Sequence, residues 1–179
     1  MANNIQYPTE WNTELLGQLS ELKIGGTPSR SVNNYWDKSK KGNNLWVSIK
    51  DMNKKCVVDT NEYISDIGVK KSSVKLLPKG TLLMSFKLTI GKVAFAGKDL
   101  YTNEAIVGLT IKDDGIISSK YLYHLLPFLN LESYSESAVK GKTLNKQKLF
   151  NIEIPHPPFP EQQKIAAILS KVDEQISQT

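Results

Sequence analysis

The side chains of this chain that could carry chemistry are mostly lysines and amides, and they gather at predicted turns. Lysine ammonium groups neutralise phosphates, while amide and hydroxyl groups can hydrogen-bond to base edges. Binding residues commonly lie on loops that a rigid scaffold positions, so these clusters are the candidate binding residues. They are Thr27, Ser29, Arg30, Lys38, Lys40, Lys41, Asn43, Lys50, Lys87, Thr89, Lys92, Lys140, Lys142 and Asn145, with Asn44, Lys54, Lys55 and Thr143 beside them.

The overall charge also favours an anionic partner. The 179 residues carry a net charge of +5, and the sequence pI is about 9.1. Arg30 is the only arginine among the 23 basic residues, although arginine is the commoner bidentate partner of guanine. Amide, hydroxyl and backbone groups would therefore make most of any contacts to bases. A general bias toward lysine would give the same composition, so charge alone does not prove such a partner.

Two motifs suggest enzymatic chemistry, and both depart from the pattern that the chemistry needs. Gly141-Lys142-Thr143 resembles the end of a phosphate-binding P-loop, but the glycine required five residues earlier is Glu136. His156-Pro157-Pro158-Phe159 resembles the motif of amino-methyltransferases, but histidine is a poor substitute for the residue that accepts the target amino group. No glycine-rich strand–turn–helix for S-adenosylmethionine precedes it.

Metal and redox sites are also not expected. Cys56 is the only cysteine, and His124 and His156 are the only histidines, so the usual ligands for a zinc cage are missing. The sequence predicts no catalytic group, no metal and no cofactor.

Hydrophobic patterning and turn residues predict the elements that position the clusters. Residues 11–24 fit either a helix or a strand. Residues 51–59 and 133–140 are expected to be polar loops, and Trp36 and Trp46 are expected in the core. We predict strands over 45–49, 61–64, 81–85, 92–96 and 104–111, helices over 65–73 and 119–131, a glycine turn over 141–145 and a helical turn over 144–150. This is an α+β domain with a mixed or antiparallel sheet and short helices, over residues 1–154.

A helical arm is predicted to follow, over residues 155–179. Pro157, Pro158 and Pro160 interrupt any strand, and Pro160 suits the first turn of a helix. Ile165, Leu169, Val172 and Ile176 then recur at spacings of four, three and four, with Ile168 beside them, which is the narrow seam of a coiled coil. The opposite face is predicted to carry Gln162, Gln163, Lys171, Glu174 and Gln175. The seam must pack either on another helix or on the chain's own domain.

Three ordered strings resemble a known family. GGTPS, YW and LWVSIKDM come first, LLPKGTLLMSFKLTIGKVAFAG follows, and EQQKIAAIL with a D-x-x-I seam begins the arm. This order is similar to the specificity (S) subunits of type I restriction-modification systems. The resemblance implies a non-catalytic target recognition domain that recognises one half of a bipartite DNA site. It also implies docking to the methyltransferase (M) subunit and, through it, to the restriction (R) subunit, with the helix as a spacer between half-sites.

The chain departs from that family in having one recognition domain and one such helix, where a full subunit has two of each. We therefore expect a half subunit or a truncated piece. One hypothesis is that two copies pair through Ile165, Leu169, Val172 and Ile176, forming a homodimer that recognises an interrupted palindrome. The rival is a protein-interaction domain that acts through its helix without DNA. With no signal pattern and no long apolar run, we expect a cytoplasmic location.

Overall fold

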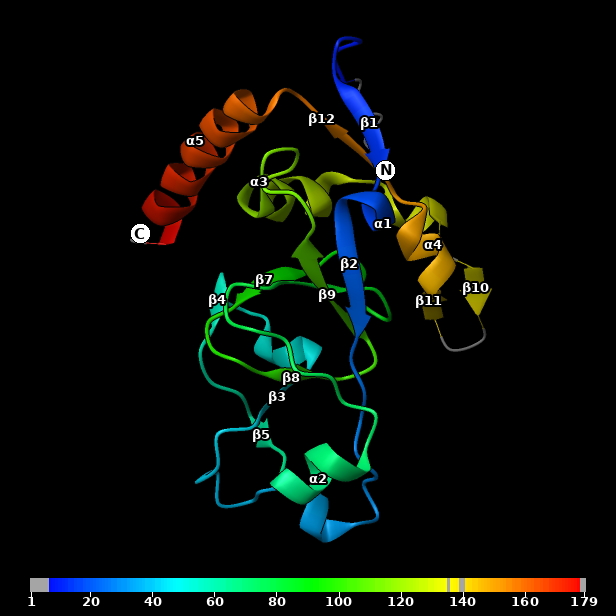
Figure 1. Cartoon of the computed structure of the whole chain (residues 1–179), viewed down its shortest axis with the longest axis vertical. Helices are drawn as coiled ribbons and strands as arrows, with labels where there is room; N and C mark the ends of the chain where they lie inside the picture. The colour runs from blue at the N-terminus through cyan, green and yellow to red at the C-terminus, as the bar shows by residue number, and fades with distance from the viewer. Residues whose placement is uncertain (1–6, 135, 139–140, 178–179) are drawn as a thin grey trace.

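The computed structural model describes residues 7–134, 136–138 and 141–177, and it has an α+β architecture as predicted (Figure 1). Within the described residues, the largest sheet has five strands in the order β2-β9-β6-β7-β4. All neighbours are antiparallel except β4 and β7, which are parallel, so the sheet is mixed. Its strands are β2 (Ser20–Ile24), β4 (Cys56–Val57), β6 (Leu82–Ser85), β7 (Val93–Ala96) and β9 (Ile106–Ile111).

This sheet is buried on both faces, which explains why its central strand β6 has three consecutive apolar residues, Leu82 to Met84. Leu82 and Met84 of β6 point into one hydrophobic core, while Leu83 points into a second core on the opposite face. Alternate residues of a strand face opposite sides, so a strand between two cores needs apolar residues at every position. The first core is covered by helices and the second by a smaller sheet.

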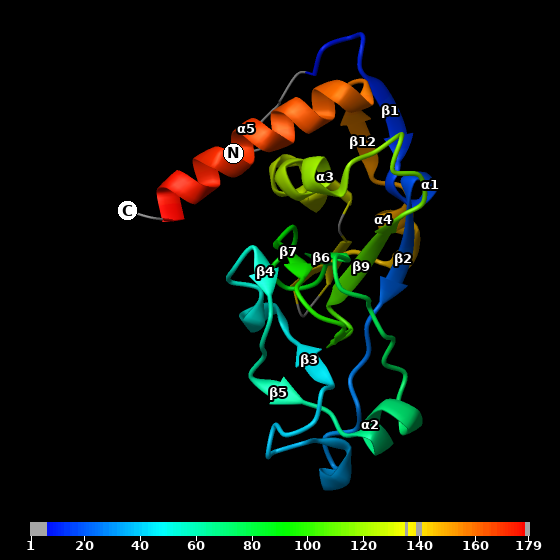
Figure 2. The ribbon, with the colours of Figure 1, turned by 60° about the vertical axis from the view of Figure 1, so that its left-hand side comes forward.

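The smaller sheet has the order β5-β3-β8 and lies toward the end of the molecule that carries α2, away from α5 (Figures 1 and 2). Trp46 of β3 is 3% exposed, and the Trp36 ring meets it edge-on with centroids 5.0 Å apart. Trp46 is therefore in the core, as predicted, whereas Trp36 is only half-buried and packs against the edge of this cluster. The elements here are η1 (Asn33–Tyr35), β3 (Leu45–Val47), η2 (Ile49–Asp51), β5 (Glu62–Tyr63), α2 (Asp66–Lys71) and β8 (Tyr101–Thr102).

The ambiguous segment 11–24 contains both kinds of structure. It forms β1 (Asn12–Leu15), the single helical turn α1 (Leu16–Leu19) and then β2. β1 pairs antiparallel with β12 (Glu153–His156), so the beginning and the end of the described domain are joined in one ribbon. The arm therefore follows directly after β12, a strand that is held in place by its pairing with β1.

Two helices begin directly after a serine N-cap. The Ser65 hydroxyl accepts from the Gly68 amide at the start of α2, and Ser118 does the same for Tyr121 at the start of α3 (Ser119–Leu125). Pro127 lies in the 3-10 turn η3 (Leu126–Phe128), so the helix predicted to reach residue 131 ends earlier. The remaining elements here are η4 (Leu131–Tyr134) and α4 (Lys146–Phe150).

Two segments predicted to be loops contain strands. Residues 51–59 include β4, and residues 133–140 include β10 (Glu136–Ala138), which pairs antiparallel with β11 (Gly141–Thr143). The glycine turn predicted over 141–145 is thus a strand in its first three residues. Period-2 hydrophobicity was absent because these short edge elements are polar or only two residues long, so no pattern marked them.

The arm is α5 (Phe159–Ser177), which follows Pro157 and Pro158 and has Pro160 as its second residue. It lies across α3 on the outside of the domain (Figure 2). Within the described residues, no helix has both the length and the apolar content needed to cross a membrane.

Candidate nucleic-acid interface

The first candidate cluster, Thr27 to Arg30, is held by contacts within the chain. The Arg30 guanidinium forms a bidentate pair with Glu62 and stacks over the Trp36 ring, 3.8 Å from its centroid. The Thr27 hydroxyl donates to Glu104. These partners were not apparent from the sequence, because Glu62 and Glu104 lie far along the chain. Arg30 and Thr27 thus have a structural role in this turn, although the Arg30 side chain remains 53% exposed.

The carboxylate that holds Thr27 is also electrostatically stabilised. Burial alone would raise the pKa of Glu104, but the Thr27 hydroxyl, Lys87 and Arg30 together hold that pKa below its ordinary value. Glu104 is therefore ionised at neutral pH and is held by the Thr27 hydroxyl in a positive surrounding.

Two lysine clusters that are separated by a strand in sequence converge on one open groove. Lys40 from the loop before β3 and Lys50 and Lys54 from the segment after it line a cavity of about 340 Å³. Asn53 and Asn61 line it as well. We call these five residues the lysine groove. It combines cationic groups for phosphates with amides that can contact base edges.

The acidic residues of the same cavity are already engaged by protein donors. Asp51 accepts from the Ser48 hydroxyl at 2.7 Å and from the Asn61 side chain at 2.7 Å. Asp59 accepts from the Tyr63 hydroxyl at 2.8 Å and from the Thr60 amide, and these bonds lower the pKa of Asp59. The bonds to Asp59 favour its ionised form, so both carboxylates count against an anion. The three lysines of the same lining outnumber these two carboxylates, and the groove therefore keeps a net positive charge.

The other candidate residues divide between structural and exposed positions. Lys92 donates to Asn53 at 2.6 Å, which ties the base of the β6–β7 hairpin to the lysine groove. Asn145 caps α4 by accepting from the Lys148 amide at 2.9 Å. The Leu144 amide donates to the Phe86 carbonyl at 3.1 Å, which places residue 144 beside that hairpin.

Some candidates lie apart from the groove or cannot be placed. Lys38, Lys41 and Asn43 are exposed in the loop before β3. Ser29 is also outside the groove, where its hydroxyl lies 2.8 Å from that of Ser31. Lys140 lies outside the described residues, and Lys142 is described only through its backbone.

The His-Pro-Pro-Phe motif lies in the interior. The His156 side chain is 4% exposed, and its Nε2 atom lies 3.4 Å from the Glu14 carboxylate of β1. A residue that accepts a target amino group must be reachable by a base. This placement favours the structural interpretation of the motif.

The arm is fixed to the domain by Gln162, which the sequence placed on the outer face. Gln162 is 0% exposed. Its Oε1 accepts from the Ser118 amide at 2.9 Å, and its Nε2 donates to the carbonyls of Ile116 and Pro157, each at 2.9 Å. Ala166, one turn later, is also buried. No periodicity signals such a residue, because a buried glutamine is polar in any hydrophobic pattern.

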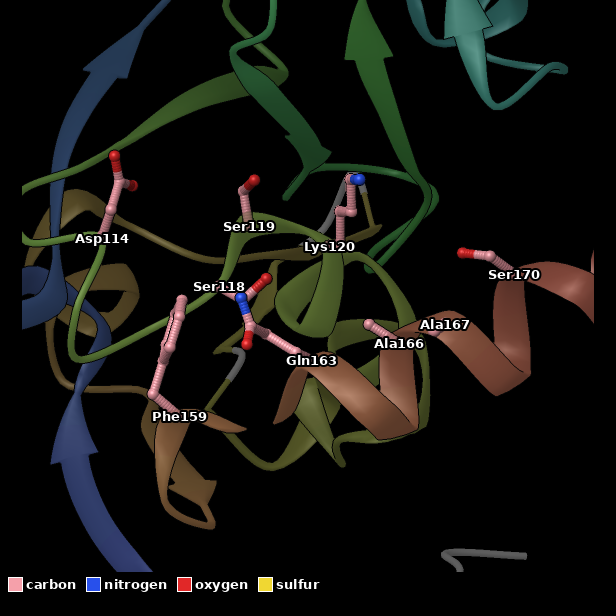
Figure 3. A pocket seen from close by; sticks show the side chains of 9 residues that line it. All are labelled: Asp114, Ser118, Ser119, Lys120, Phe159, Gln163, Ala166, Ala167 and Ser170. Carbon is pink, nitrogen blue, oxygen red and sulfur yellow. The ribbon is translucent and has the colours of Figure 1, made fainter. Parts of the chain in front are cut away.

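On one side, a cavity lies between the arm and the domain from Phe159 to Ser170. This cavity of about 400 Å³ lies between the start of α3 and the arm, with Ser118 and Lys120 on one wall and Gln163 and Ala167 on the other (Figure 3). Ala166 lines this cavity as well, so the hydrogen bonds that join the arm to the domain here are those of Gln162.

Most of the predicted seam faces away from the domain. Ile165 packs partly against the first core, but Leu169, Val172 and Ile176 are 37%, 43% and 70% exposed. Ile168 is exposed beside them. We call Ile165, Ile168, Leu169, Val172 and Ile176 the arm seam. The arm packs on its own domain, as one alternative from the sequence has it, and leaves most of its seam open. Packing of the seam on another helix stays a prediction.

A polar chain crosses between the domain and the middle of the arm. Lys55 donates to the Ser170 hydroxyl at 3.2 Å, and Ser170 lies 3.1 Å from Nε2 of His124 on α3. Nδ1 of His124 is 3.7 Å from the Asp173 carboxylate. A lysine can only donate, so this arrangement favours a Ser170 proton directed at Nε2 and a histidine proton on Nδ1, facing Asp173. In this row of polar contacts, His124 is a neutral imidazole.

Acidification is expected to weaken the docking of the arm through His124. Burial lowers the pKa of His124, with Lys55 adding to the effect and Asp173 opposing it. A histidine with a lowered pKa contributes stability above its unfolded value of about 6.5, and this is lost as pH falls through the folded value. The wild-type chain should therefore lose melting temperature between about pH 7.5 and 5.5 more steeply than His124→Gln. Parallel curves for the two proteins would contradict this expectation.

A comparison with protein families places the chain. The model of the type I restriction modification DNA specificity domain matches residues 8–179. The chain belongs to this family. The match includes the arm as well as the globular part, and it confirms the resemblance seen in the three sequence strings.

Relatives in this family are specificity subunits of named type I restriction enzymes. The MjaIX specificity subunit of Methanocaldococcus jannaschii is 33% identical over 175 residues, which cover 94% of this chain and 39% of that protein. The EcoR124I/EcoR124II specificity subunit of Escherichia coli is 31% identical over 170 residues, covering 92% and 41%. The chain thus spans about two fifths of the length of these relatives.

Solved structures confirm the fold. The HsdS subunit from Thermoanaerobacter tengcongensis matches with a TM-score of 0.71 at 19% identity, covering 98% of this chain and 40% of that one. A chain from a study of complex assembly and conformational transition of the type I R-M system matches with a TM-score of 0.75 at 21% identity, covering 98% and 41%. The α+β domain followed by a helix is therefore a known arrangement in this family.

Proposed function

We propose that this chain is a DNA recognition module of a type I restriction-modification specificity subunit, and that it recognises one part of a bipartite target. Family membership supports the specificity role. The main observation in support of DNA binding is the lysine groove, where Lys40, Lys50 and Lys54 lie beside Asn53 and Asn61. Lysines hold phosphates without regard to sequence, and amides beside them can distinguish bases.

The chain itself performs no chemistry in this proposal. It positions DNA for a methyltransferase subunit and, through that subunit, for a restriction subunit. The arm seam is the proposed protein-contact surface, because an apolar stripe on a helix needs a partner helix to bury it. A second copy of the chain could also occupy this seam. In the rival function, the seam alone would act and DNA would not bind.

Removing two groove lysines tests the DNA contact directly. Lys50→Ala with Lys54→Ala should weaken binding to duplex DNA, and should reduce the slope of log K against log salt by about 2 if both lysines contact phosphate. Fluorescence anisotropy at several salt concentrations measures both quantities. Lys164→Ala with Lys171→Ala, which removes the same charge from the exposed face of the arm, is the control and should leave the slope unchanged. An equal slope for the groove variant would contradict the assignment.

A further inference from the structure

The tip of the β6–β7 hairpin presents a leucine in an unusual backbone conformation. Leu88 has φ of +65°, and its side chain is 72% exposed. In the part of the chain that the structure describes, positive φ outside glycine occurs only at Lys40 and Leu88. Both residues lie in turns that the sequence marked as candidate binding sites, and Lys40 belongs to the lysine groove.

The hairpin loop that carries Leu88 is held by hydrogen bonds to Ser85, at the end of β6. Leu88 is therefore exposed on a loop that has defined contacts. Ser85 is 0% exposed. Its hydroxyl donates to the Thr89 carbonyl and accepts from the Lys92 amide at 3.0 Å, while its carbonyl accepts from the Gly91 amide at 2.9 Å. Ile90, two residues after Leu88, packs against the first core. The residues around Leu88 are therefore held in place, while the Leu88 side chain projects into solvent.

Folding gains little from a leucine at this position. The left-handed region brings the Cβ of an L-residue close to its own backbone, a cost that glycine does not bear. Burial of the side chain could offset this cost, but Leu88 is mostly in water. Strained backbone with no folding benefit occurs most often where the residue contacts a ligand.

We propose that Leu88 is an apolar base contact, which enters a groove of the duplex while neighbouring lysines hold the phosphates. This inference rests on the proposed DNA recognition function. Lys92 ties the hairpin base to Asn53 of the lysine groove, and Lys87 directly precedes Leu88, so the surroundings are cationic. Apolar side chains in DNA-binding proteins contact thymine methyl groups or insert at base steps. A cationic setting favours DNA over an apolar protein surface as the partner.

The test compares Leu88→Gly, Leu88→Asn and Lys87→Ala on duplexes that the wild-type chain enriches from a random-sequence pool. Glycine relieves the left-handed conformation, and asparagine tolerates it while lacking the apolar group. Both Leu88 variants should keep or raise the melting temperature, by up to a few degrees. Both should weaken DNA binding about tenfold, since a buried leucine contact is lost. Their salt slope should equal that of wild type, whereas Lys87→Ala should lower the slope by about 1.

Each other outcome overturns the inference in a distinguishable way. If the wild-type chain binds DNA and both Leu88 variants bind it with the same affinity, Leu88 is not part of the interface, but the recognition function is intact. A clear fall in melting temperature would show that Leu88 is a packing residue. Loss of methyltransferase-subunit binding with normal DNA binding would assign the loop to a protein contact. If the wild-type chain enriches no duplex, the recognition function fails and the inference fails with it.

Discussion

Leu169→Asp with Val172→Asp is expected to abolish pairing through the arm seam while leaving the domain folded. Both side chains are partly exposed on the outer side of α5, so the carboxylates can stay hydrated in the isolated chain. In a helix–helix interface they would be buried without partners. Losing two apolar contacts and burying unpaired charge should cost about 3 kcal/mol or more, which weakens association at least about 100-fold.

The measurement is twofold. Light scattering across a concentration series reports self-association, and copurification with a coexpressed methyltransferase subunit reports the larger assembly. Lys164→Asp with Lys171→Asp places two carboxylates at exposed positions of the same helix outside the arm seam, and it should behave as wild type in both assays. A wild-type chain that stays monomeric at high concentration would exclude the homodimer. A seam variant that still retains the methyltransferase subunit would place that contact elsewhere.

The arm seam was predictable because it depends on a local period. Residues at spacings of three and four fall on one side of a helix whatever the rest of the chain does. The starts of the helices predicted over 65–73 and 119–131 are local for the same reason, since the caps Ser65 and Ser118 act within three residues of their own positions. Central strands such as β6 were also marked by continuous apolar residues that two cores require.

The candidate site was only partly predictable, because its geometry depends on distant pairs. The sequence identified Arg30 and Lys92 as cations at turns, but it could not show that Glu62 binds one and Asn53 the other. It also could not show that Lys40 and Lys50, on opposite sides of a strand, line one groove. Charge and turn residues indicate which side chains can bind an anion, and tertiary contacts decide which of them are already engaged.

Gln162 is the residue that sequence reasoning misplaced, and its substitution should have a large effect on stability. Gln162→Ala would leave the Ser118 amide and the carbonyls of Ile116 and Pro157 without the partner that each has now. A buried polar group that loses its partner costs about 1–3 kcal/mol, so the total should be about 2–4 kcal/mol after water relieves part of the loss. Thermal and urea unfolding measure this difference. Gln163→Ala, at the exposed neighbouring position, should change stability by less than about 0.5 kcal/mol.

Gln162→Glu distinguishes hydrogen bonding from packing, because it keeps the shape of the side chain and removes its donors. A glutamate can still accept from the Ser118 amide, but its second oxygen would face two carbonyl oxygens that now receive hydrogen bonds from Nε2 at 2.9 Å. Burial and this repulsion should raise the pKa of the introduced carboxyl above about 4.3. A raised carboxyl pKa means that the folded state binds the proton more tightly, so the stability deficit of Gln162→Glu relative to wild type should shrink as pH falls toward 5. A deficit that is independent of pH would show that the side chain is not held among these carbonyls, and that the arm is oriented by other contacts.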